Sequence, residues 1–147
     1  MAHVKLISYA EILTYPGLLA EYAAECSIPE IGPINPQPQI YAQMEAAGIA
    51  RCFGVFHAES LIGFACLLTT VYPHYGVKVA TLESLFVSNQ FRGSNAGTKL
   101  MQAVEAYAKE AGCKAILYSA PAKGKLERLL SKRKMGRKTN SVFCFPL

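Results

Sequence analysis

The fold of this chain is decided by residues 82–98, whose sequence is Leu-Glu-Ser-Leu-Phe-Val-Ser-Asn-Gln-Phe-Arg-Gly-Ser-Asn-Ala-Gly-Thr. The apolar run up to Val87 predicts a buried strand, and a turn of small residues then opens a helix over about 95–111. The first N–H groups of a helix have no acceptor within it, and the helix dipole adds partial positive charge there, so such a turn is suited to bind phosphate groups. Glu83 is the only charged residue over 79–91, so an isolated carboxylate stands close to this anion site.

This arrangement resembles the GNAT superfamily of N-acetyltransferases, in which a strand ending in Val is followed by Gln/Arg-x-x-Gly-x-Gly/Ala and a helix. The matching residues are Arg92-Gly93-Ser94-Asn95-Ala96-Gly97. The resemblance is strongest over residues 79–118. Asn95 stands where the family has its middle glycine, and Asn tolerates a left-handed backbone better than other residues with a side chain, so we expect the turn to be kept.

The resemblance implies an α/β (α+β) fold, with a mixed central sheet of about six strands flanked by about four helices. It also implies acetyl-CoA as the cofactor, and direct transfer of its acetyl group to a primary amine of a small molecule or peptide. The main chain at the end of the fourth strand would then hold the pantetheine arm and polarise the thioester carbonyl. The residues that the resemblance assigns to acetyl-CoA are Leu85, Phe86, Val87, Arg92, Gly93, Ser94, Asn95, Ala96, Gly97 and Thr98.

Glu83 is the candidate general base. An alkyl amine with a pKa near 10.4 is only about 0.04% neutral at pH 7, so acetyl transfer benefits from a group that accepts its proton. Glu83 stands four residues before Val87, as the family's catalytic carboxylate often does, and its apolar neighbours predict an enclosed setting for the side chain. A Glu that faces solvent, or that pairs with a Lys of a neighbouring strand, is the alternative.

The general acid has no direct counterpart in this sequence. Many GNAT enzymes have a Tyr four residues before the Gly that ends the last helix, and counting back from Gly136 gives Lys132. Tyr118 is the substitute candidate, although a packed aromatic residue would produce the same pattern. Solvent can also protonate a thiolate, whose conjugate acid has a pKa near 8.5. The missing Tyr leaves open an alternative function, a non-catalytic acyl-CoA binding module that engages a partner through its basic C-terminal helix.

Composition indicates one domain spanning residues 1–147. Hydrophobic residues make up 52% and charged residues 17%, which excludes a disordered chain. No apolar run approaches the roughly 20 residues of a membrane span, and residues 1–10 lack the features of a secretory signal. The five cysteines form no C-x-x-C pair and have no His at ligand spacing, so we expect buried thiols and no metal. We therefore expect a cytoplasmic protein that does not bind membranes.

The net charge of +5 is concentrated near the C-terminus. Residues 123–138 contain eight Lys or Arg and one Glu, so this segment carries +7 and the remainder carries −2. A solvated helix face, contact with the phosphates of the cofactor, and an acidic partner such as nucleic acid are the alternatives. No aromatic residue interleaves this segment, which makes nucleic acid the least favoured partner.

Patterning along the rest of the chain predicts the order of the remaining elements. We expect strands over 4–8, 50–57, 60–72, 77–88, 114–119 and 141–145, and helices over 9–26, 40–47 and 125–135. Pro16-Gly17 should interrupt the first helix, and the strand over 114–119 should lie parallel to its predecessor. Four tyrosines near the expected acceptor site are candidates for an aromatic wall, namely Tyr9, Tyr15, Tyr22 and Tyr41. The apolar residues 142–145 are compatible with a homodimer that forms through this segment, although a core strand would have the same composition.

Overall fold

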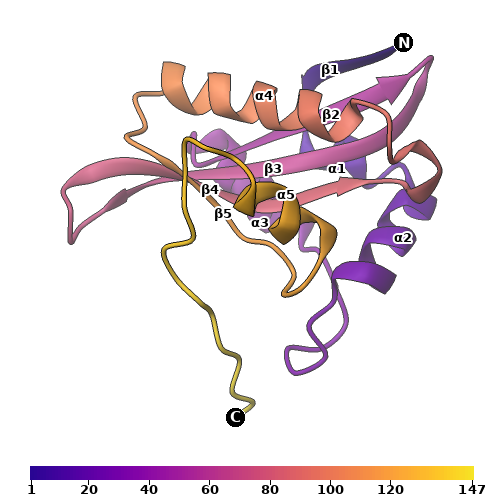
Figure 1. Ribbon diagram of the computed structural model, residues 1–147. Coiled ribbons are helices and arrows are strands. Elements are labelled where there is room, and N and C mark those ends of the chain that lie inside the picture. The colour runs from indigo at the N-terminus through magenta and orange to yellow at the C-terminus, as the bar shows by residue number, and fades with distance from the viewer.

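A computed structural model describes all residues 1–147, and its centre is one five-stranded sheet in the order β1-β2-β3-β4-β5 (Figure 1). The strands are β1 (Ala2–Ile7), β2 (Ala50–His57), β3 (Ser60–Tyr72), β4 (Val77–Val87) and β5 (Ile116–Tyr118). Neighbouring strands are antiparallel except β4 and β5, which are parallel as predicted. The hairpin between β2 and β3 turns at residues 58–59, also as predicted.

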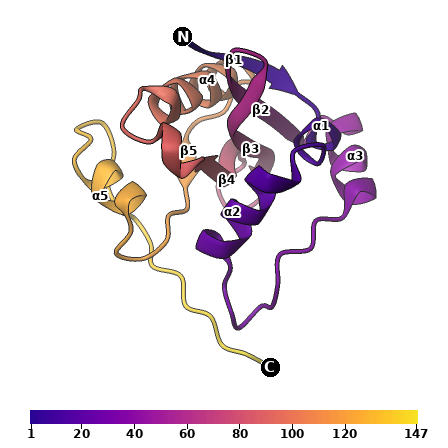
Figure 2. The same ribbon diagram turned by 90° about the vertical axis from the view of Figure 1, so that its right-hand side faces the viewer.

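Helices cover both faces of the sheet. One face carries α1 (Tyr9–Ile12), α2 (Pro16–Cys26) and α3 (Pro38–Ala46), and the opposite face carries α4 (Ala96–Glu110) (Figures 1 and 2). A short 3-10 helix, η1 (Asn89–Phe91), joins β4 to the turn before α4, and α5 (Lys125–Ser131) follows β5. None of the helices has the length and apolar character needed to span a bilayer.

Two apolar clusters form the core, one on each face of the sheet. Under α4 the side chains of Leu100, Val104 and Ala108 are buried, because their four-residue spacing brings them to one stripe of the helix. On the other face Ile12 and Leu18 are buried against the sheet. Strand residues alternate between the two clusters, as the two-residue period of a strand requires.

Proline sets the boundary between α1 and α2. Pro16 is the first residue of α2, where the missing N–H costs nothing and the ring fixes a helical φ. The predicted interruption of the helix over 9–26 is therefore confirmed. Pro38 begins α3 in the same way, two residues before the predicted start.

The C-terminal part of the chain differs from the prediction. Residues 139–147 form no strand, so the sheet has five strands rather than six. Val142, Phe143 and Phe145 are exposed, and this segment runs away from the sheet (Figure 2). The helix predicted over 125–135 ends at Ser131, four residues earlier than expected. An apolar pattern can predict a strand but cannot supply the edge with which it pairs.

Candidate active site

A β-bulge in β4 positions Glu83. Cys66 of β3 pairs with Ser84, and the next β3 residue, Leu67, pairs with Leu82, so Glu83 is one extra residue in β4. A bulge of this kind re-aims a side chain, and here it lets two consecutive residues, Glu83 and Ser84, line the same cavity. In a regular strand they would point to opposite faces.

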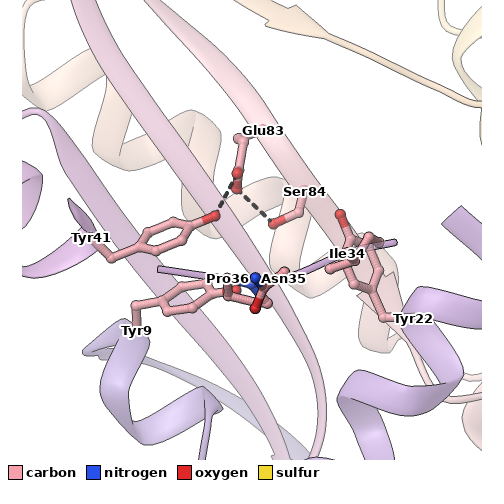
Figure 3. A pocket seen from close by; sticks show the side chains of 8 residues that line it. All are labelled: Tyr9, Tyr22, Ile34, Asn35, Pro36, Tyr41, Glu83 and Ser84. Atoms are coloured by element: carbon pink, nitrogen blue, oxygen red, sulfur yellow. Dashed lines mark hydrogen bonds between the residues drawn. The ribbon is translucent and has the colours of Figure 1, made fainter. Parts of the chain in front are cut away.

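The cavity lies on the face of the sheet covered by α1, α2 and α3, and has a volume of about 220 Å³. Figure 3 shows Tyr9 and Tyr41 on one side, Tyr22 and Ile34 on the other, and Glu83 and Ser84 between them. Its lining residues are Tyr9, Tyr22, Ile34, Asn35, Pro36, Tyr41, Glu83 and Ser84. Glu83 is therefore the only charged group in the cavity.

Two hydroxyl groups hold the Glu83 carboxylate (Figure 3). Tyr41 donates from its hydroxyl to Oε1 at 2.6 Å, and Ser84 donates to Oε2 at 3.3 Å. The side chain is exposed to the open cavity, so the enclosed setting predicted from the sequence is wrong. Of its apolar neighbours, Leu82 is buried in the cluster under α4, on the opposite face of the sheet, and Phe86 is buried in the cluster on the face of the cavity.

Three tyrosines form the aromatic wall of the cavity. The rings of Tyr9 and Tyr41 stack with their centroids 3.5 Å apart and 1° between their planes. Tyr22 packs edge-on against Phe64, at a centroid distance of 5.3 Å. Burial raises the pKa of all three phenols, and the bond to Glu83 raises that of Tyr41 further, so they remain neutral donors at neutral pH. The fourth candidate, Tyr15, does not line the cavity.

Next to this cavity β4 and β5 separate. Their parallel pairing covers only residues 80–82 of β4, although β4 continues to Val87. The N–H of Ser88 donates to the Ile62 carbonyl in β3 at 2.9 Å. Because N–H groups alternate along a strand, those of Leu85 and Val87 point the other way, toward the open edge. By the same alternation the N–H of Phe86 faces β3, so Leu85 and Val87 are the residues with main-chain donors at that edge.

The turn before α4 presents free N–H groups. Those of Gly93, Asn95, Gly97 and Thr98 have no acceptor within the protein, whereas the Ala96 N–H donates to Ser94 Oγ at 3.3 Å. Gly93 supplies the left-handed conformation with φ at 86°, and Asn95 adopts φ −88°. Unpaired donors at the start of a 15-residue helix suit a bound diphosphate or other anion.

Arg92 connects the end of β4 to α2. Its Nε donates to the Val87 carbonyl at 2.9 Å, and its two terminal nitrogens donate to both carboxylate oxygens of Glu25 at 2.8 and 2.7 Å. One helical turn earlier, Glu21 accepts from the Ser88 hydroxyl at 3.0 Å. Arg92 thus links the end of β4 to α2. Sequence reasoning missed Glu21 and Glu25, whose four-residue spacing on one helix face was the available signal.

Tyr118 does not reach the cavity. It packs against the cluster under α4, and its hydroxyl donates to Glu105 Oε1 at 2.5 Å. Arg133 donates to the same carboxylate at 2.6 Å. Glu83 and Tyr118 therefore lie on opposite faces of the sheet, which contradicts the expectation that they act on one substrate. Burial raises the pKa of Tyr118, as expected for a packed phenol.

The fold and the strand-turn-helix site define an acyltransferase of the α+β class. The sequence model of the acetyltransferase (GNAT) family matches residues 18–129, about three quarters of the chain, and the protein belongs to this family. Acetyl-CoA is the cofactor of the family, and the chain is an acetyl-CoA dependent N-acetyltransferase. Among curated proteins no sequence matches it significantly.

Solved structures share the fold at low sequence identity. The ribosomal-protein-alanine N-acetyltransferase of Brucella melitensis biovar Abortus 2308 has a TM-score of 0.75 at 17% identity, over 100% of this chain and 99% of that chain. The aminoglycoside acetyltransferase meta-AAC0020 from an uncultured soil metagenomic sample, in complex with sisomicin, gives 0.76 at 12% identity, over 99% and 96%. AAC(6')-Iy in complex with a bisubstrate analogue of CoA gives 0.74 at 15% identity, over 100% and 98%. These likenesses show the GNAT fold.

Proposed function

We propose that this enzyme acetylates a primary amine of a small molecule or peptide by direct transfer, with Glu83 as the general base. One observation carries the proposal: the bulge in β4 aims the Glu83 carboxylate into a cavity at the point where β4 parts from β5. A carboxylate in a cavity beside unpaired main-chain donors has the two functions that acyl transfer requires, a proton acceptor and a donor for the carbonyl oxygen.

Each group has a role in the reaction. Glu83 accepts the proton of the acceptor ammonium, while Tyr41 and Ser84 fix the orientation of its carboxylate. The cofactor supplies an acetyl thioester, whose carbon–sulfur bond breaks as the carbon–nitrogen bond forms. The Val87 N–H is the donor for the carbonyl oxygen, and the free N–H groups of residues 93–98 are the donors for the diphosphate. After attack the acylated nitrogen loses its second proton to solvent, and solvent protonates the thiolate, so the proposal does not use Tyr118.

Transfer to a panel of amines tests this proposal. We expect Glu83→Gln to lower kcat/KM by about 10²- to 10⁴-fold at neutral pH, the range of general base catalysis. The matched control is Glu110→Gln, an exposed Glu at the end of α4 on the opposite face of the sheet, which should leave kcat/KM unchanged. Equal activity of Glu83→Gln and the parent at every pH would remove Glu83 from the mechanism. Acetyl-CoA binding without transfer to any amine would favour a binding module instead.

The proposal includes a cytoplasmic location and a homodimer. All five cysteines are free thiols, which suits a reducing compartment. The exposed apolar side chains of Val142, Phe143 and Phe145, together with the unpaired outer edge of the short strand β5, favour contact with a second copy. Light scattering on the full chain should give the mass of a dimer, and deletion of residues 139–147 should give a monomer. A monomeric full chain at micromolar concentration would exclude this dimer.

A further inference from the structure

The segment that covers the acceptor cavity is acidic throughout. Residues 6–50 contain no Lys, Arg or His, and they run from the end of β1 through α1, α2 and α3 to the start of β2. The same segment supplies six of the eight residues that line the cavity. Its acidic residues are Glu11, Glu21, Glu25, Glu30 and Glu45.

Most of these glutamates form no salt bridge. Only Glu25 is in a salt bridge, with Arg92 at 2.7 Å. The other two salt bridges of the molecule, Arg133 with Glu105 and Lys138 with Glu127, involve the C-terminal part of the chain. Four glutamates of the acidic segment, and Glu83 inside the cavity, therefore form no salt bridge, and the one Arg near the segment is Arg51, which lies beside Glu11 and Glu45 in a second cavity. Charges of one sign around a cavity raise the local concentration of ligands of the opposite sign.

The cavity also lacks any group that would neutralise an anion. Glu83 is its only charged side chain, and its three phenols stay neutral. A carboxylate of an acceptor placed here would lose water without gaining a cationic partner, which is costly. Its volume of about 220 Å³ corresponds to roughly seven water molecules, which is room for a short aminoalkyl arm. The remainder of a longer acceptor would lie over the acidic segment.

We infer that the acceptor is an aliphatic amine with at least one further positive charge and with no carboxylate close to the reacting nitrogen, as in a diamine or polyamine. This inference rests on the proposed function and narrows its substrate class. The reacting ammonium lies at Glu83 between the tyrosines, where ring faces add a cation–π attraction, and the second charge meets the glutamates of residues 6–50 that form no salt bridge.

Three amines of equal chain length test the inference: putrescine, n-butylamine and γ-aminobutyrate, whose far ends are positive, apolar and negative. We expect kcat/KM to be about tenfold higher for putrescine than for butylamine, and lower for γ-aminobutyrate than for both. At an ionic strength of about 1 M the Debye length falls to roughly 3 Å, and the advantage of putrescine should shrink while butylamine is little affected.

A charge-reversing substitution tests whether the acidic segment causes the preference for putrescine. Glu30 lies in the connection between α2 and α3, four residues before Ile34 of the cavity; it is exposed and takes part in no side-chain hydrogen bond. The variant is Glu30→Lys. It should lower kcat/KM for putrescine about fivefold and leave butylamine unchanged. The matched control is Glu110→Lys on the opposite face, which should change neither substrate.

The outcomes separate the inference from the proposed function. Acetylation of all three amines at similar rates, or a preference for γ-aminobutyrate, would overturn the inference and leave Glu83 as base intact. Equal losses in Glu30→Lys and Glu110→Lys would assign the effect to net charge alone and also overturn it. Failure to acetylate any amine would count against the proposed function first, and the inference would fall with it.

Discussion

Residues 6–50 and residues 123–147 differ in both charge and packing. The first segment is acidic and buries Tyr9, Ile12 and Leu18 against the sheet. The second is basic up to Lys138, and its last nine residues expose their apolar side chains. A packed segment can hold side chains in fixed positions for chemistry, whereas an exposed one is available for contact with another molecule. The difference agrees with the proposals that the acceptor binds at the first segment and that a second copy contacts the second.

The two segments approach each other near the end of β4. The pKa of Glu25 in α2 is lowered first by its hydrogen bonds from Arg92, and the charge of Lys125 at the start of α5 adds to this. The basic segment therefore begins close to the turn whose free N–H groups suit a diphosphate. Contact of basic residues with the cofactor phosphates, one of the alternatives drawn from the sequence, stays a prediction, and Lys125 is the residue with which to test it.

The largest expected effect contrasts packing in the two segments. Ile12→Ala removes a side chain with 0% exposure and should lower the free energy of unfolding by about 2–5 kcal/mol. Phe143→Ala, at 78% exposure, should change it by no more than about 0.5 kcal/mol in the monomer. Urea unfolding at low protein concentration measures both. A loss above about 1 kcal/mol for Phe143→Ala would mean that the C-terminal segment packs on its own domain, and the contrast would fail.

The second effect compares two tyrosines that each donate a hydrogen bond to a glutamate, Tyr41 on the face of the cavity and Tyr118 on the face under α4. Tyr41→Phe keeps the stack on Tyr9 but removes the donor to Glu83, and should lower kcat/KM roughly tenfold, as expected for loss of a hydrogen bond to a charged group. The matched change Tyr118→Phe removes the donor to Glu105 on the opposite face and should leave kcat/KM within about twofold. Steady-state kinetics with one amine compares them. A larger loss for Tyr118→Phe would restore that residue as the general acid.

These tyrosines show what the sequence could predict. The strands over 50–57 and 60–72 have the predicted bounds, because alternating and continuous apolar runs are local signals. Glu83 was singled out as the lone charge of its strand, but its aim into the cavity depends on one unpaired residue in the register with β3, which no pattern within β4 reveals. The donor Tyr41 lies 42 residues from Glu83, and only folding brings the two together.

The errors have the same physical origin. Tyr118 was the candidate to replace the missing general acid, but side chains of neighbouring strands share a cavity only when they point to the same face, and Tyr118 packs under α4. The strand predicted over 141–145 has the apolar residues of a strand, although a strand also requires an edge to pair with. Register, face and partner are properties of pairs of segments, and a single sequence specifies them only indirectly.

A third effect tests the link between α2 and the strand end. Arg92→Met keeps the length of the side chain and removes the pair with Glu25 and the bond to the Val87 carbonyl. Because this pair is partly exposed, we expect a loss of only about 1 kcal/mol in unfolding free energy. We also expect a several-fold rise in KM for acetyl-CoA, since the donors of the adjacent turn lose their fixed position. The control Arg133→Met breaks the corresponding pair with Glu105 and should leave that KM unchanged.

The smallest effect is the pH dependence of those two pairs. Arg92 lowers the pKa of Glu25, and Arg133 lowers that of Glu105, below the ordinary value of 4.5. A carboxylate with a lowered pKa in the folded state stabilises the fold above its ordinary pKa, and this contribution is lost as pH falls through the folded-state pKa. Unfolding free energy should therefore decrease below about pH 4.5 in the parent, and less steeply in Glu25→Gln and Glu105→Gln, with a difference of at most about 1 kcal/mol for each partly exposed pair. Urea unfolding at pH 7 and pH 3 measures the slopes. If only Glu105→Gln makes the loss of unfolding free energy with falling pH less steep, then the pair of Glu25 with Arg92 does not stabilise the fold. The packing of Ile12 and Leu18 would then hold the acidic segment in place.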